Sequence, residues 1–183
     1  MSEEILVQCC APTLAGIKTG SMFSIEFETE EQMTRELRLL NRQLSSAGIC
    51  VLSLRYHNGK ALLYLFRPAL LREDMKRHDV REILKQAGYV DLRIGESIRK
   101  LIQRIRLGDG FPHEVGLFLS YPPEDVRGFI ENHAQNCKLI GYWKVYGDEE
   151  KARSTFARYK ACTDSYCRRL KNGQTLSDLA VAI

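Results

Sequence analysis

The sequence lacks the local residue pairs on which small metal and redox sites depend. It contains six cysteines and four histidines, but no two cysteines are separated by two residues and no two histidines have metal-binding spacing. Zinc fingers and thioredoxin-like redox sites require such pairs. No Gly-x-Gly-x-x-Gly motif is present, and residues 16–20 resemble a phosphate-binding loop only superficially. We therefore expect no structural metal and no P-loop.

Long apolar segments are also absent. The longest, near residues 49–54 and 61–66, fall far below the roughly 18 to 20 residues that cross a bilayer. The first four residues, Met-Ser-Glu-Glu, lack the basic start of a signal peptide. These absences predict a soluble, cytoplasmic protein without a membrane partner, in which the cysteines are thiols.

The composition is that of an ordinary globular protein. Hydrophobic residues make up 44% and charged residues 27% of the 183 positions, with a net charge of +4. A chain of this length falls within the usual range of one domain, and no stretch has the composition of a linker. We expect a single domain over residues 1–183.

The hydrophobic pattern predicts an α+β fold. An amphipathic helix is expected over 28–47, followed by a hairpin over 49–67 whose turn is Asn58-Gly59. A two-residue turn would place Leu54 opposite Leu63. Helices are expected after Pro68, before Gly108, after Pro123 and over 149–171, and short strands over 115–119 and 139–146. The predicted architecture is a mixed, mostly antiparallel sheet with a central hairpin, covered by amphipathic helices.

Cys10 is the first candidate for chemistry. Cys9 and Cys10 precede Pro12, which is typical of the first turn of a helix, and a thiol at a helix N-terminus has a lowered pKa and a larger reactive thiolate fraction. The alternative is structural, because cysteine is among the most frequently buried residues and this pair could end a strand.

His113 and Glu114 form the second candidate, a general base beside a carboxylate. Neighbouring residues on a regular strand point to opposite faces, so both would face one pocket only where the backbone is irregular. The alternative is a hydrogen-bonded structural histidine.

Basic residues form the third candidate. Arg55, Arg67 and Lys144 lie within or at the ends of predicted strands, where a charge requires a partner, solvent or an anionic ligand. An anion-binding site and internal ion pairs are both consistent with this pattern. The predicted helices 94–108 and 149–171 carry many lysine and arginine side chains. Because no nucleic-acid-binding motif accompanies them, a solvated basic face is more plausible than a nucleic-acid surface.

Long polar and glycine-containing motifs run through nearly the whole chain. They include Cys10–Lys18, Leu52–Arg55, Phe111–Leu119 with Tyr121-Pro122, and Trp143–Tyr146 with Tyr159–Cys162. In these stretches the sequence resembles DUF3793, a family of unknown function common in anaerobic gut bacteria. The resemblance implies no activity, but it favours Cys10 over Cys9 and adds Cys162 to the candidates. Ser120 departs from it, because a glycine is expected before Tyr121.

Two functional hypotheses follow. In the first, Cys10 is a nucleophile or thiol ligand in a small-molecule site, His113 with Glu114 supplies acid/base chemistry, and Lys18, Arg55 or Lys144 neutralises an anionic substrate. In the second, the protein is a non-catalytic binding or regulatory module for an anionic metabolite, a protein or nucleic acid. A metal–thiolate role is a third alternative. The sequence leaves cofactors, oligomeric state and the choice between enzyme and binder open.

Overall fold

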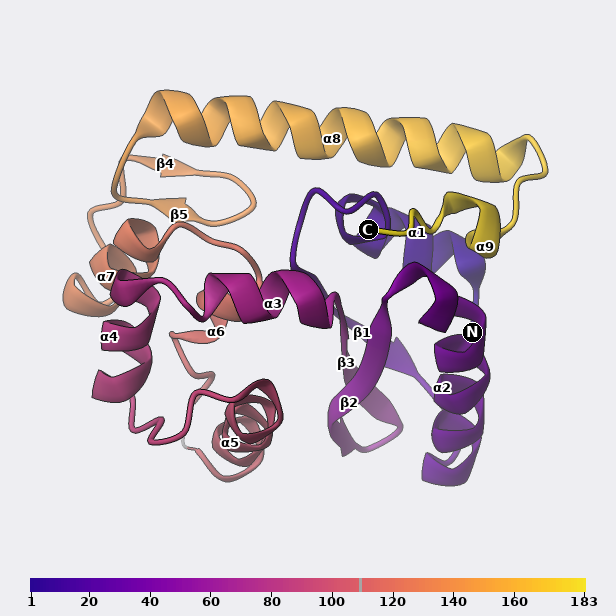
Figure 1. Cartoon of the computed structure of the whole chain (residues 1–183), viewed down its shortest axis with the longest axis horizontal. Helices are drawn as coiled ribbons and strands as arrows, with labels where there is room; N and C mark the ends of the chain where they lie inside the picture. The colour runs from indigo at the N-terminus through magenta and orange to yellow at the C-terminus, as the bar shows by residue number, and fades with distance from the viewer. Residues whose placement is uncertain (109) are drawn as a thin grey trace. The chain divides into compact units, whose positions relative to one another are not determined.

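The computed structural model describes residues 1–108 and 110–183 and has the α+β fold predicted from the sequence (Figure 1). The sequence also predicts a flexible break at residues 108–110, and Asp109 within it lies outside the described residues. The chain groups into two compact units, which we call unit 1 (Met1–Leu71 with Cys162–Ile183) and unit 2 (Arg72–Ala161). The expectation of a single domain stays a prediction.

Unit 1 contains a three-stranded antiparallel sheet. Its strands are β1 (Gly20–Glu26), β2 (Cys50–His57) and β3 (Lys60–Phe66), in the order β1-β3-β2. The predicted turn is confirmed, because Asn58 and Gly59 have φ angles of 47° and 75°, as a two-residue hairpin turn requires. Only β3 is central, whereas β2 lies at an edge of the sheet.

The predicted hairpin register is correct only near the turn. Arg55 pairs with Leu62, but Ser53 pairs with Leu63, so the pairing shifts by one residue at Leu54. The predicted pairing of Leu54 with Leu63 is therefore wrong. A β-bulge leaves the extra residue outside the ladder, and Leu54 is fully buried there.

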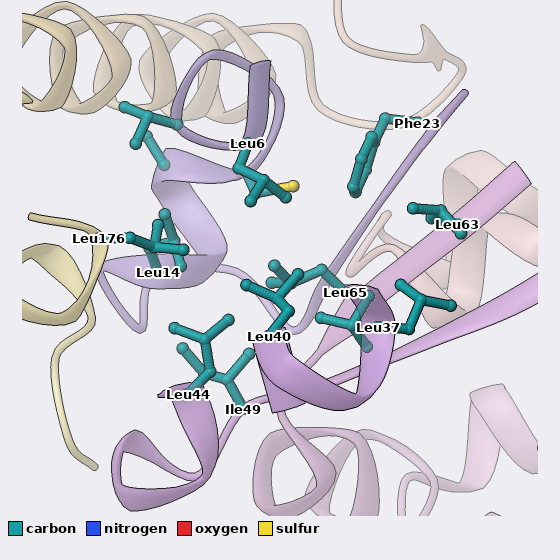
Figure 2. Packing of buried hydrophobic residues seen from close by; sticks show 14 of the residues in the cluster. Leu6, Leu14, Phe23, Leu37, Leu40, Leu44, Ile49, Leu63, Leu65 and Leu176 are labelled. Carbon is teal, nitrogen blue, oxygen red and sulfur yellow. The ribbon is translucent and has the colours of Figure 1, made fainter. Parts of the chain in front are cut away.

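Side chains of the strands form the core of unit 1 together with those of several helices (Figure 2). These helices are α1 (Glu3–Leu14), α2 (Glu30–Leu44) with the 3-10 turn η1 (Ser45–Ala47), the last turns of α8 (Glu149–Lys171), and α9 (Leu176–Leu179). The predicted amphipathic helix is confirmed, because the predicted apolar stripe of α2 is buried. The stripe and its partners on α1, β1 and β3 include Leu37, Leu40, Leu44, Leu6, Leu14, Phe23, Leu63 and Leu65.

Unit 2 is mainly helical. It contains the end of α3 (Pro68–Asp74), α4 (His78–Gln86), α5 (Ile94–Leu107), α6 (Val115–Phe118), α7 (Pro123–Glu131), the hairpin β4 (Leu139–Ile140) and β5 (Lys144–Val145), and the first part of α8. Most of these helices occur where the sequence predicted them. None of the helices within the described residues is long and apolar enough to span a membrane.

Two strand predictions in unit 2 need correction. Residues 115–118 form the helix α6, because this apolar run is buried on all sides and so carries no alternation that could specify a strand. The predicted strand 139–146 is interrupted by a turn, which leaves two residues in each of β4 and β5. Both differences place backbone turns beside His113 and Trp143.

Candidate functional site

A half-open pocket of about 440 Å³ lies in unit 2. Its volume is within the range of small-molecule sites, roughly 300 to 1,000 Å³. Its walls come from residues 111–113, 115 and 116, from Tyr121, from α7 and from the β4–β5 hairpin. Three polar side chains line it, namely His113, Asp125 and Lys144, and the other large side chains are apolar or aromatic: Phe111, Pro112, Val115, Tyr121, Val126, Phe129, Ile140 and Trp143.

A glycine lets two walls of this pocket approach each other. A Cβ atom on Gly116 would lie 2.8 Å from Val126 and 2.9 Å from Tyr121, too close for any side chain. Ser120, which precedes Tyr121, has a φ of 61°, in the left-handed region that favours glycine. The backbone before Tyr121 therefore has the left-handed conformation that favours the glycine expected there, although a serine occupies the position.

Asp125 fixes the hairpin that forms one side of the pocket. Its Oδ2 accepts a hydrogen bond of 2.6 Å from Nε1 of Trp143, and its Oδ1 accepts bonds of 2.7 Å from the backbone N–H groups of Tyr146 and Gly147. Asp125 is 3% exposed, and hydrogen bonds to a buried carboxylate are strong. The α7 carboxylate thus holds Trp143 in one orientation.

Lys144 and His113 adjoin the same aromatic ring. The Nζ of Lys144 lies 5.9 Å from the centre of the Phe129 ring and donates a hydrogen bond of 2.7 Å to the carbonyl of Ala134. The ring of His113 meets Phe129 edge-on, with 5.1 Å between ring centres. Because an ammonium group has three donors, Lys144 keeps donors for a ligand beyond its bond to Ala134.

The loop that Lys144 contacts is conformationally strained. His133, Ala134 and Asn136 have φ angles of 47°, 61° and 56°, although side-chain-bearing residues rarely adopt positive φ, alanine least readily of these three. Such residues persist where the surroundings hold them and often occur at ligand sites. The hydrogen bond from Lys144 is one of the contacts that hold this loop.

Glu114 makes structural hydrogen bonds within unit 2. It is 2% exposed, and its Oε1 accepts hydrogen bonds from Nε of Arg104 at 2.5 Å and from the hydroxyl of Tyr89 at 3.0 Å. Burial is the main cause that raises the pKa of the Tyr89 hydroxyl, and the negative charge of the nearby Glu114 carboxylate raises it further. Glu114 and His113 both line a second pocket of about 420 Å³ with Arg104 and Gln86. The irregular backbone thus allows both residues to reach one pocket.

Cys10 is not at a helix N-terminus. It lies in the second half of α1, which runs from Glu3 through Pro12 to Leu14, and it is fully buried. Burial raises the pKa of its thiol, and a buried thiol with a raised pKa is a poor nucleophile. The argument for thiolate activation by a helix end was therefore wrong at this position.

Lys18 lies near Cys10 in unit 1. Burial lowers the pKa of Lys18 from 10.5 to about 8, and the nearby Cys10 opposes this shift. The hydroxyls of Thr13 and Ser21 are 2.9 Å apart in the same region, where Ser21 also bonds Cys10. Cys10, Thr13 and Ser21 are buried, whereas Lys18 lies in the loop between α1 and β1 and is partly buried.

Arg67 has a structural role instead of the predicted ligand-binding role. It is fully buried, and its guanidinium donates hydrogen bonds of 2.6 to 2.8 Å to four backbone carbonyls, those of Thr13, Leu14, Ala47 and Val181. Thr13 and Leu14 end α1 and Ala47 ends η1, so the cation satisfies carbonyls at helix C-termini. This explains how a charge is tolerated at the end of a buried strand.

The remaining predicted residues are dispersed within unit 1. Arg55 is exposed on the edge strand β2. Cys162 is half-buried against the apolar core, and burial raises its pKa. Of the eight candidates, the structure groups His113, Glu114 and Lys144 in unit 2, and Cys10 with Lys18 in unit 1. No cluster of three or more His, Cys, Asp or Glu side chains suited to a metal occurs in the described part of the chain.

Sequence reasoning missed Asp125, Phe129 and Trp143. The sequence predicts only a helix after Pro123, in which both Asp125 and Phe129 lie. The signal that could have found them is the single tryptophan, because a buried indole N–H requires an acceptor.

Fold and site together define an α+β protein with an aromatic pocket that carries one lysine and one histidine. The chain belongs to the family described as protein of unknown function (DUF3793), whose model matches residues 6–180. Neither the curated proteins nor the solved structures include a match to the chain.

Proposed function

We propose that the protein is a non-catalytic binding module that holds a small anionic molecule in the pocket of unit 2. The observation that carries the proposal is the pocket itself, in which aromatic and aliphatic side chains surround His113, Asp125 and Lys144. The hydroxyl of Tyr121, which also lines the pocket, donates to the carbonyl of Tyr142. Asp125 is already occupied by Trp143 and two backbone N–H groups. The polar groups left for a ligand are therefore His113 and Lys144, and both favour an anion when charged.

The pocket fits binding better than thiol catalysis. The predicted nucleophile Cys10 is fully buried, and burial raises the pKa of its thiol, so little reactive thiolate is present. Glu114 is held by Arg104 and Tyr89, so its carboxylate is committed to structural contacts. A binding role requires neither of them to react. The cytoplasmic location expected from the sequence is part of this proposal.

Lys144 is the residue on which the proposal depends most. It is half-buried, and its amine has the three donors of an ammonium group, one of which bonds Ala134. A ligand anion at Lys144 would replace water in a mostly apolar surrounding, where a charge-assisted hydrogen bond is stronger than in bulk water. The apolar walls would bury the rest of the ligand.

The test uses the single indole N–H resonance of Trp143 in an ¹⁵N-labelled sample of the full chain. We expect 2-naphthoate to shift this resonance saturably and its neutral analogue 2-naphthamide to bind at least about tenfold more weakly, because the amide lacks the charge that pairs with Lys144. Equal affinity for acid and amide would refute the anion site.

A matched pair of lysine variants completes the design. Lys138 also donates to a backbone carbonyl, that of Gly147 at 2.8 Å, but it does not line the pocket. Lys144→Met should weaken naphthoate binding about tenfold, whereas Lys138→Met should leave it unchanged. Equal effects of the two substitutions would show that Lys144 has no specific part in binding.

A further inference from the structure

The pocket of unit 2 is lined by aromatic rings from several segments. Phe111 precedes α6, Tyr121 follows it, Phe129 belongs to α7, and Trp143 directly precedes β5. The ring centres of Tyr121 and Trp143 are 5.0 Å apart, and those of Trp143 and Phe156 are 4.5 Å apart at an interplanar angle of 79°. With the Asp125 bond, these contacts fix the Trp143 ring before any ligand arrives.

Phe111 differs from the other three rings. Its side chain is half-exposed, with 50% of its surface accessible, and in the described part of the chain it makes no ring–ring contact. Ile140, which lines the same pocket, is 69% exposed. Two large apolar side chains at the rim of one pocket therefore retain surface that a ligand could bury.

The carboxylate of Asp125 also lines this pocket, but its oxygens accept hydrogen bonds from Trp143 and two backbone N–H groups. Lys144 and, when protonated, His113 remain to pair with one negative charge on a ligand. None of the described residues lining the pocket is an arginine, so the forked donor geometry that suits phosphate is absent there. Lys144 and His113 beside Phe129 offer N–H donors that are not arranged as a rigid fork. A carboxylate satisfies this arrangement better than a phosphate, which carries more charge and more acceptor oxygens.

We infer that the ligand is an aromatic carboxylate, with its ring against Phe111 and its carboxylate at Lys144. This inference rests on the proposed function and adds the chemical class of the ligand. Aromatic pairs in offset or edge-to-face geometry are stabilised beyond their buried area. A flat aromatic acid should therefore bind more tightly than a saturated acid with the same carbon skeleton.

The test compares 2-naphthoate with decahydronaphthalene-2-carboxylate, followed through the Trp143 indole resonance of the full chain. We expect the aromatic acid to bind about fivefold to tenfold more tightly. Equal affinities would overturn the aromatic inference and leave the anion site intact. If neither acid binds, both the inference and the proposed function fail.

Phe111→Leu provides the matched variant, because it keeps an apolar side chain at an exposed position and removes only the ring. We expect naphthoate affinity to fall to the level of the saturated acid, and the affinity of the saturated acid to stay unchanged. An unchanged ratio of the two affinities would show that Phe111 does not recognise the ring. Saturable binding of decahydronaphthalene-2-carboxylate reports that the variant is folded.

Discussion

The indole Nε1 of Trp143 donates a hydrogen bond of 2.6 Å to Oδ2 of Asp125, and both side chains are buried. This bond connects the segment just before β5 to the first turn of α7. Because both residues line the pocket, the wall that a ligand would meet is fixed by a carboxylate beside it.

Asp125→Asn should destabilise unit 2. An amide N–H₂ group would face the indole N–H, so one bond to a charged acceptor would be lost, at a cost of about 2 kcal/mol. Urea unfolding followed by Trp143 fluorescence measures the change. Asp148→Asn is the control, because Oδ1 of Asp148 accepts from the N–H of Lys151 at the start of α8, a role that asparagine fills equally well. Equal effects of the two substitutions would contradict the prediction.

Arg67→Met should destabilise the chain by about 3 kcal/mol or more. Four backbone carbonyls would each lose a charged donor, and three of these hydrogen bonds, those to Thr13, Leu14 and Ala47, are buried. Circular dichroism during urea unfolding measures the loss. Arg55→Met is the matched control and should change stability by no more than about 0.5 kcal/mol, because Arg55 is exposed. If both variants were equally stable, the structural role of Arg67 would be refuted.

Cys9 should react with iodoacetamide ahead of Cys10 at neutral pH, because Cys9 is exposed and Cys10 is buried with a raised pKa. This reverses the order expected from the sequence. The two are adjacent, so the measurement is mass spectrometry of a Cys9→Ser variant, in which Cys10 should be labelled only after denaturation. Rapid labelling of Cys10 in the folded variant would restore the nucleophile hypothesis.

The burial of Lys18 should make stability depend on pH. Its folded pKa of about 8 is below its ordinary 10.5, because burial disfavours the charged amine. Between these pH values the unfolded chain binds more protons than the folded chain does. The destabilisation caused by burying the charged amine is therefore complete below about pH 8 and decreases as the pH rises to about 10.5.

Lys18→Met should therefore be more stable than the natural chain at pH 7, on the order of 1 to 3 kcal/mol, and the difference should shrink by pH 10. Urea unfolding at pH 7, 8, 9 and 10 measures this dependence. Lys60→Met is the control, because the Lys60 side chain is 69% exposed and its substitution should have a small effect at every pH. A constant difference between Lys18→Met and the natural chain would contradict the assigned burial cost.

The local structure was largely predictable because it depends on neighbouring residues. Asn58-Gly59 specified a turn, and the stripe of α2 specified a helix, since both signals are complete within a few positions. The one-residue shift at Leu54 was not predictable, because a bulge depends on how the whole strand packs. The predicted strand over 115–119 was wrong for a related reason. Residues 115–118 form a buried helix, and a fully buried segment shows no hydrophobic periodicity that distinguishes helix from strand.

The candidate site was only partly predictable. His113, Glu114 and Lys144 were identified as polar residues in apolar contexts, but their partners Phe129, Arg104 and Ala134 come from other segments. Arg67 shows why residue type alone misled the prediction. A buried arginine can be satisfied entirely by backbone carbonyls, and no sequence pattern marks the carbonyls that will meet it.

The four carbonyls that Arg67 binds also constrain the order in which the chain can fold during synthesis. The carbonyl of Val181 lies 114 residues after Arg67, and unit 1 is assembled from residues 1–71 and 162–183. Unit 2 is continuous in sequence and can close while the chain is still emerging from the ribosome. Unit 1 must wait for its second segment, so its early helices and strands remain without their last core partners until residues 162–183 have been synthesised.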